Sequence, residues 1–139
     1  MTANYIKNVG SGLKARLATI TELLQVFALH ELPSKVDVFP AAIMLLGQVD
    51  YDPTFDSDPD FIIRVIILTS NQDTPTALTL LVDFLETSGT KSVRAAIEGD
   101  KTMGGKCSDS RLVRSLGFGS TQLGRVTYLS TEFEVQIYA

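Results

Sequence analysis

The sequence has one cysteine and no apolar run long enough to cross a bilayer. Cys107 has no second cysteine with which to form an internal disulfide, so we expect synthesis in a reducing, intracellular compartment and a buried structural thiol. A membrane-spanning helix needs about 20 apolar residues, and the opening "MTANYIKNVGSG" lacks the apolar core of a signal peptide. These absences predict a soluble protein with no membrane partner.

Histidine is equally scarce, and this limits the chemistry available. His30 is the only histidine, whereas a zinc site needs several histidine or cysteine ligands and a serine–histidine–aspartate triad would depend on this one residue. The segment "ALHEL" lacks the second histidine of a metalloprotease helix, since that position is Ser34. The glycines of "GSG" at 10–12 lack the preceding strand of a dinucleotide-binding fold, and "MGGKCS" at 103–108 lacks the full spacing of a P-loop. We therefore predict no enzyme activity, no catalytic residues, no cofactor and no metal.

Basic residues are fewer than acidic ones. The chain has 12 Lys and Arg against 16 Asp and Glu, a net charge of −4, which argues against tight binding of nucleic acid. Residues 1–86 hold eleven acids and five bases (net −6), and residues 87–139 hold five acids and seven bases (net +2). This asymmetry suits head-to-tail association, in which an acidic edge of one copy meets a basic edge of the next.

The acidic excess is concentrated in "DYDPTFDSDPDF", residues 50–61, whose aspartates are Asp50, Asp52, Asp56, Asp58 and Asp60. A helix–loop–helix calcium loop needs glycine at its sixth position and glutamate at its twelfth. Counted from Asp56, those positions hold Phe61 and Ile67, so this kind of site is excluded. Three interpretations remain: a solvated loop, an interaction arm, or weak incidental binding of a divalent ion.

Apolar patterning predicts the elements of the first half of the chain. Apolar residues at steps of three or four between Ile6 and Ile20 predict a helix, and Gly10 and Gly12 predict that its first half frays or that it starts at Ser11. Three apolar runs predict strands, and the fourteen residues between the last two form a long connection. The runs are 23–29, 41–46 and 61–68, and the connection is 47–60.

The second half is predicted to contain two helices and two strands. Thr74 as the cap and Pro75 as the first residue predict one helix, and "KSVRAAIEGD" predicts a short one that ends at Gly99. The apolar stripe of the longer helix consists of Leu78, Leu81, Val82 and Leu85. Gly104 and Gly105 predict a turn with positive φ.

Residues 107–116 and 125–139 complete the pattern as strands. In the last of these, alternate residues from Leu129 to Ile137 predict a core face, and the residues between them, from Ser130 to Gln136, predict a wet face. The order of elements predicts one α+β domain over residues 1–139. Its mainly antiparallel sheet would pack against two or three helices and carry a long acidic hairpin arm.

Several segments together resemble one protein family. They are "GLKARLATI", "PAAIMLLGQVDYDPTF", "FIIRVIILTSNQD", "ALTLLVDFLETSGTKSVRAAIEGDKTMGG" and "VTYLSTEFEVQIYA". In their order and wording they resemble the tail terminator (tail completion) proteins of long-tailed bacteriophages with non-contractile tails. The resemblance implies a small α+β subunit in a ring, usually of six copies, that caps the tail tube, stops its polymerisation and faces the head-side connector. It implies no catalytic residues.

This resemblance sets the expected partners and location. We expect a structural virion protein of the tail or neck, made in the host cytoplasm, that binds its own copies, the major tail tube protein and a head-side neck protein. DNA would only pass through a lumen that repels phosphate. The expected interface or lumen residues are the five aspartates together with Arg111, Arg114 and Arg125, which lie on predicted strands without aromatic neighbours. The alternatives are a neck or head-completion protein of the same virion and a small calcium-dependent binding module.

Overall fold

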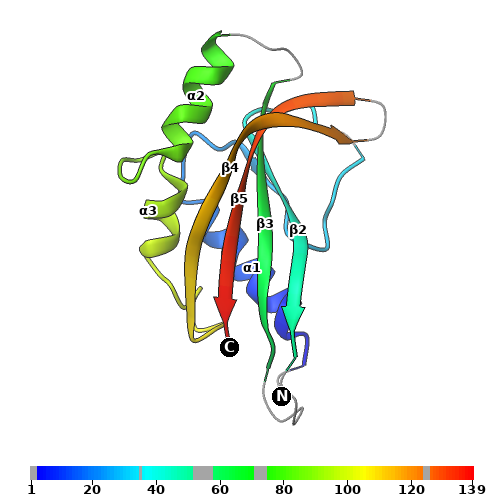
Figure 1. The fold of residues 1–139 in the computed structure, drawn as a ribbon, viewed down its shortest axis with the longest axis vertical. Coiled ribbons are helices and arrows are strands. Elements are labelled where there is room, and N and C mark those ends of the chain that lie inside the picture. Colours follow the sequence, from blue (N-terminus) through cyan, green and yellow to red (C-terminus); the bar gives the residue numbers. More distant parts are fainter. Residues whose placement is uncertain (1–2, 35, 52–57, 71–74, 124–125) are drawn as a thin grey trace.

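The computed structural model describes residues 3–34, 36–51, 58–70, 75–123 and 126–139. It is an α+β fold in which a five-stranded sheet, in the order β1-β2-β3-β5-β4, is accompanied by three helices (Figure 1). The β1–β2 pair is parallel and the other pairs are antiparallel. The predicted fold class and the predicted order of elements are therefore confirmed. The elements are α1 (Tyr5–Leu17), β1 (Gln25–Val26), β2 (Ala41–Asp50), β3 (Asp60–Ser70), α2 (Pro75–Leu85), α3 (Val93–Glu98), β4 (Asp109–Leu123) and β5 (Val126–Tyr138).

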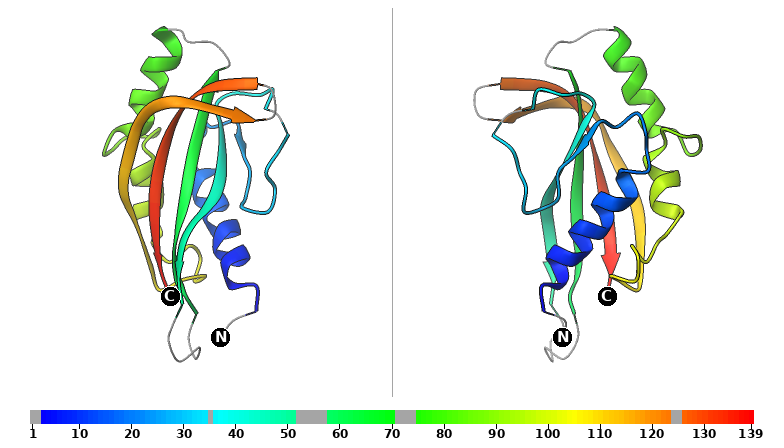
Figure 2. Two further views of the ribbon diagram at one scale, coloured as in Figure 1. Left: turned by 45° about the vertical axis from the view of Figure 1, so that its right-hand side comes forward. Right: turned by 180° about the vertical axis from the view of Figure 1, so that it is seen from behind.

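The helices lie on one side of the sheet, with α1 across its face and α2 and α3 towards the β4 edge (Figure 2). The main core fills the space between the sheet and helices α1 and α3. These helices and the sheet carry apolar side chains on the sides that face each other. On β5, the alternation predicted from the sequence is confirmed for Thr131, Phe133, Val135 and Ile137, which are all buried. The other large contributors are Val9, Leu13, Leu17, Phe61, Ile63, Val65, Ile67, Val93 and Ile97.

A second, smaller core covers the upper part of the opposite face. There the β4–β5 hairpin bends over the sheet (Figure 1), and Tyr128 packs against Ile66 and Leu68. The backbone N–H of Val36 donates to the Tyr128 hydroxyl at 3.0 Å. The bend explains why the C-terminal half of β3 is buried on both faces, as its apolar run predicted. The bend also buries Ser130, so the prediction that this residue lies on the solvent-exposed face of β5 is wrong.

The expected fraying of the first helix is wrong. Helix α1 begins at Tyr5 and continues through Gly10 and Gly12, both of which are buried. A Cβ added at Gly12 would lie 2.7 Å from the Met103 carbonyl oxygen, and one at Gly10 would lie 3.1 Å from Leu29 Cδ1. The glycines allow close contact between α1 and its neighbours, and that packing offsets their low helix propensity.

The connection between the second and third strands is shorter than residues 47–60. Strand β2 continues to Asp50 and β3 begins at Asp60, and these two residues face each other in the register. The connection is therefore 51–59, and residues 52–57 within it lie outside the described part. The predicted long acidic arm falls on these residues and stays a prediction.

The remaining local predictions are mostly confirmed. Helix α2 begins at Pro75, while the predicted cap, Thr74, lies outside the described residues. Val82 is exposed and Phe84 is buried, so the predicted stripe is wrong at Val82. Helix α3 ends at Gly99, as predicted. Gly104 and Gly105 have φ of 72° and 85°, as their predicted turn requires. Within the described ranges, no helix is both long and apolar enough for a transmembrane span.

Candidate functional site

The candidate functional site consists of two surfaces, the two outer edges of the sheet, which are formed by different strands. Strand β4, 15 residues long, forms one edge, and no described strand pairs with its outer side. At the other edge β1 pairs only with Ala41 and Ala42, so the rest of β2 has no outer strand among the described residues. An edge strand offers unpaired N–H and C=O groups to a further strand. Both edges can therefore accept a partner.

The described aspartates of the 50–61 segment lie at the end of the β2–β3 hairpin. Asp50 is exposed and accepts a hydrogen bond from Gln48 Nε2 at 2.9 Å. Asp60 is half-buried and accepts the backbone N–H of Ala139 at 2.8 Å. Asp58 is also half-buried and lies next to β3 in the chain. Of the predicted acidic residues, Asp52 and Asp56 lie outside the described part.

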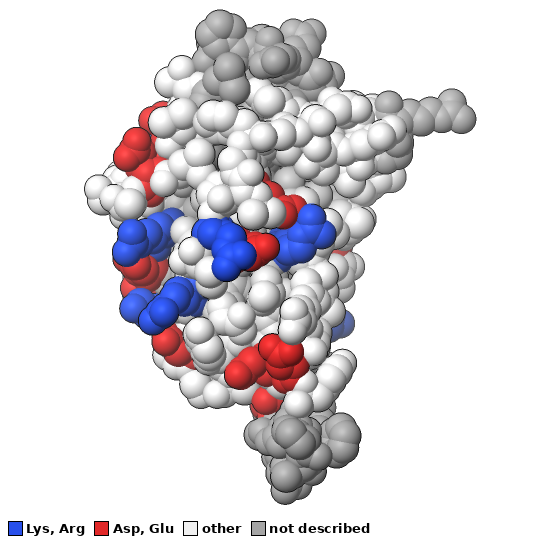
Figure 3. Space-filling view, viewed as in Figure 1, with Lys and Arg blue, Asp and Glu red and all other residues white. Residues whose placement is uncertain are grey.

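Two of the three predicted arginines, Arg111 and Arg114, lie on β4, with β3 and β5 between that strand and β2. Arg111 is exposed, and Arg114 forms an ion pair with Glu134 of the same copy, with Nη1 and Oε2 3.4 Å apart. The third predicted arginine, at position 125, falls outside the described residues. Figure 3 shows basic and acidic side chains side by side across the middle of this face, with an acidic group lower down. Of the predicted residues, Asp50 therefore lies on the β2 edge and Arg111 and Arg114 lie on β4 at the opposite edge, whereas Asp58 precedes and Asp60 begins the inner strand β3.

Sequence reasoning missed three exposed apolar residues on β4: Val113, Leu116 and Phe118. Two register shifts against β5, at 112–114 and 115–118, interrupt the in-and-out alternation of β4. The broken alternation in "RLVRSLGF" was the available signal. The three residues lie within six positions of one edge strand, where exposed apolar side chains can form a contact site. We name Val113, Leu116 and Phe118 the β4 apolar cluster.

An apolar pocket lies near the opposite edge, between α1, the segment 29–32 and β2. It has a volume of about 380 Å³, and its lining includes Ile6, Leu29, Leu32, Met44 and Leu46, with Lys7 and His30 as its polar members. Leu32 and Leu46 are exposed in spite of their size. We name this cavity the β2 pocket. Apart from lining it, His30 is an exposed residue with no catalytic neighbour in this lining.

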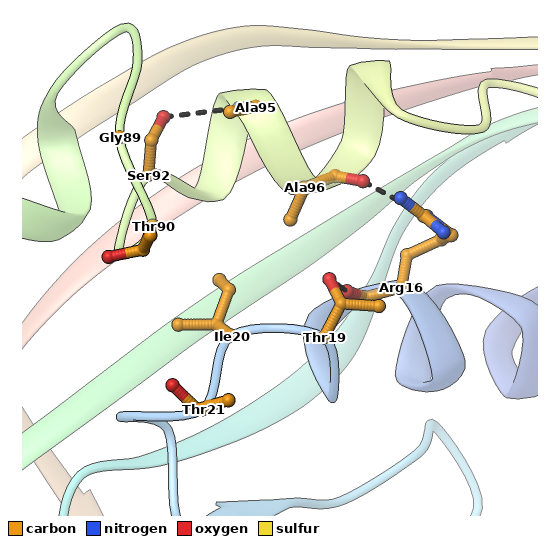
Figure 4. A pocket seen from close by; sticks show the side chains of 9 residues that line it. All are labelled: Arg16, Thr19, Ile20, Thr21, Gly89, Thr90, Ser92, Ala95 and Ala96. Atoms are coloured by element: carbon orange, nitrogen blue, oxygen red, sulfur yellow. Dashed lines mark hydrogen bonds between the residues drawn. The ribbon is translucent and has the colours of Figure 1, made fainter.

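A polar pocket of about 290 Å³ lies between the end of α1 and the start of α3 (Figure 4). Arg16 Nε donates to the Ala96 carbonyl oxygen at 3.0 Å, and Ser92 Oγ accepts the N–H of Ala95 at 3.1 Å. These polar atoms are used to join α1 to α3 and to cap α3. The lining includes no histidine, cysteine or carboxylate, so it offers no general base beside a nucleophile. Its contacts are those of a structural junction.

Metal binding depends on clusters of suitable ligands. Within the described ranges, no group of three or more histidine, cysteine, aspartate or glutamate side chains is placed to hold an ion. The calcium alternative requires such a group around Asp50, Asp58 and Asp60. The described part of the acidic segment does not supply one.

Cys107 is buried beside the 101–103 turn, as expected for a structural thiol. Burial raises its pKa to about 11, and the charges of Asp109 and Asp100 act in the same direction. Because a raised pKa favours the neutral thiol, its contribution to stability is complete below pH 9.0 and is lost as the pH rises towards 11.

We predict that Cys107 reacts slowly with thiol reagents. Near pH 8 its thiolate fraction should be roughly 100-fold below that of an ordinary thiol, because thiolate is the reactive form. The measurement compares the rate of thiol modification in native protein with the rate in urea. Equal rates in the two conditions would contradict the assigned burial.

No protein-family model matches the chain, and neither does any curated protein. Its function is therefore inferred from its surfaces.

Proposed function

We propose that the chain is a structural subunit of a ring that caps a phage tail tube, ends its polymerisation and joins the tail to a head-side connector. The observation that supports this most is the placement of Asp50 on β2 and of Arg111 on β4, at opposite edges of one sheet. A closed ring of identical subunits needs two different, complementary patches on each copy. The two edges have the required difference.

Strand direction is also compatible with such a ring. Three successive antiparallel pairings separate β2 from β4, so these two edge strands run in opposite directions. When copies are related by rotation about an axis along the strands, β4 of one copy lies antiparallel to β2 of the next. Antiparallel pairing across the contact would continue the sheet and satisfy open backbone groups on both copies.

The proposed partners follow from this role. Each subunit contacts two further copies, one face of the ring contacts the major tail tube protein, and the other face contacts a neck protein. DNA passes through the lumen without tight binding, and the net charge of −4 suits this. The proposed location is the tail or neck of the virion, after synthesis in the host cytoplasm.

Light scattering and electron microscopy of the purified chain test this proposal, first alone and then with tail tubes of a phage with a long, non-contractile tail. We expect annular particles, or a ring at one end of each tube, and shorter tubes when the chain is present during polymerisation. A chain that stays monomeric and binds no tube would refute the proposal. Binding to isolated heads but not to tubes would refute it in favour of a head-completion role.

The acidic group supplies a specific prediction. Asparagine at all five positions, Asp50, Asp52, Asp56, Asp58 and Asp60, should weaken ring formation or tail joining by about tenfold or more, since each exposed charge pair contributes roughly 0.2–1 kcal/mol. The measurement is the concentration at which the ring forms, at low and high salt.

A control variant carries Glu86→Gln and Glu98→Gln, which remove two exposed charges that lie on neither β2 nor β4. It should assemble like the wild type. If the five-asparagine variant also forms rings normally and supports a normal phage yield, the acidic segment is only solvated surface.

A further inference from the structure

We infer that the β4 apolar cluster of one copy enters the β2 pocket of the next copy, with Leu116 as the central side chain. This inference rests on the proposed ring and names the contact that closes it. It assigns the β2 pocket a protein occupant, a second copy of this chain.

The β2 pocket is suited to an apolar side chain. Its volume of about 380 Å³ accommodates a leucine or phenylalanine side chain, and its walls are mostly aliphatic. Leu32 and Leu46 are exposed at this site, so an occupant would remove large apolar surfaces from water. Lys7 and His30 supply a polar margin around the apolar centre, an arrangement common at protein interfaces.

The backbone beside Leu116 is held by hydrogen bonds. Strand β4 shifts register between Ser115 and Phe118, Gly117 in this bulge has a φ of 80°, and two side chains bond to Gly117. Ser115 Oγ accepts the N–H of Gly117 at 3.1 Å, and Thr131 Oγ1 donates to the Gly117 carbonyl oxygen at 2.9 Å. Leu116 belongs to this bulge, and 54% of its surface is exposed. A fixed backbone lowers the entropy cost of binding, because the protruding side chain is already positioned.

Charge complementarity identifies a second copy as the occupant. Leu46 precedes Asp50 by four residues on β2, and Arg111 precedes Leu116 by five residues on β4. An antiparallel contact that places Leu116 opposite Leu46 therefore brings Arg111 within a residue or two of Asp50. One alignment thus joins the apolar parts and the opposite charges of the two edges. An unrelated partner has no reason to match both spacings.

Disulfide trapping in the full chain tests this contact. Leu46→Cys and Leu116→Cys are made separately in a Cys107→Ser background, mixed and oxidised. We expect a disulfide between the two kinds of subunit in the mixture and little dimer from either variant alone. The control replaces Leu116→Cys by Leu24→Cys, because Leu24 is similarly exposed at 60% but lies next to β1. That mixture should form no specific disulfide.

Assembly of charged variants gives a second readout. Leu116→Asp should raise the concentration needed for ring formation at least tenfold, while Val82→Asp, at a 43% exposed residue of α2 that lies on neither edge strand, should leave it unchanged, with equal urea midpoints for both variants. If rings form but Leu46→Cys and Leu116→Cys do not link, and Leu116→Asp assembles normally, the inference is refuted and the proposed ring survives. If the disulfide forms but no ring ever caps a tube, the contact is supported and the proposed function fails. If neither the disulfide nor the ring forms, both the inferred contact and the proposed function are refuted.

Discussion

Phe61→Ala is expected to lower the free energy of unfolding by about 3–5 kcal/mol, the range for removing a large aromatic side chain from a core. Phe61 is fully buried at the start of β3, and its ring meets that of Tyr5 edge to face, with the ring centres 5.9 Å apart. Its removal leaves a cavity between α1 and the sheet, which α1 cannot fill while Val9 and Leu13 remain packed. Asp60 is the preceding residue, so the acidic end of the hairpin should also lose order.

Urea denaturation of purified Phe61→Ala measures this loss, and Phe118→Ala is the matched control. Phe118 is 48% exposed, so its removal should change stability by no more than about 0.5 kcal/mol. Phe61→Ala should lower stability, whereas Phe118→Ala should weaken assembly and leave stability nearly unchanged, because Phe118 belongs to the β4 apolar cluster. Similar losses of stability in both variants would mean that Phe61 is not at the centre of the core.

Gly12→Ala is expected to destabilise the protein by about 1–3 kcal/mol, although alanine favours a helix over glycine by about 1 kcal/mol. The new Cβ would lie 2.7 Å from the Met103 carbonyl oxygen and 2.9 Å from Met103 Cβ. The oxygen belongs to the backbone, and Met103 has a positive φ of 55° that restricts its movement. Helix α1 would therefore have to shift away from the 103–106 turn.

Gly10→Ala in the same helix is the control for this prediction. The nearest atom there is Leu29 Cδ1, the end of a side chain that can rotate, at 3.1 Å. The gain in helix propensity should offset that adjustment, so the urea midpoint should stay close to that of the wild type. A Gly12→Ala variant at least as stable as the wild type would show that α1 is not held tightly against Met103.

The fold class was predictable because burial leaves a periodic trace in the sequence. The alternation from Thr131 to Ile137 and the run around Val65 reflect core contacts that the structure confirms. The helix through Gly10 and Gly12 was not predictable, because helix propensity counts only local terms. The contacts that favour these glycines come from Leu29 and Met103, which are distant in the sequence.

The candidate site was predictable only in part. The charges of Asp50 and Arg111 were visible in the sequence, but their placement on opposite edges depends on β5 lying between β3 and β4. The exposure of Leu116 depends on two register shifts, which leave only an irregular alternation as a trace. The β2 pocket unites residues from three separate segments, and a single sequence does not show that they meet.

The central position of β5 has a consequence for how the chain reaches its native state. Strand β3 pairs with residues synthesised much later; 68 positions separate Arg64 from Glu132, the β5 residue with which its side chain forms an ion pair. Until β5 arrives, one side of the most apolar strand stays open to any extended segment nearby, including the β5 of another molecule. Such sequence-distant pairing forms slowly. Crowded synthesis and warm growth should therefore favour entangled or aggregated chains, whereas slow, cool expression should favour correctly folded ones.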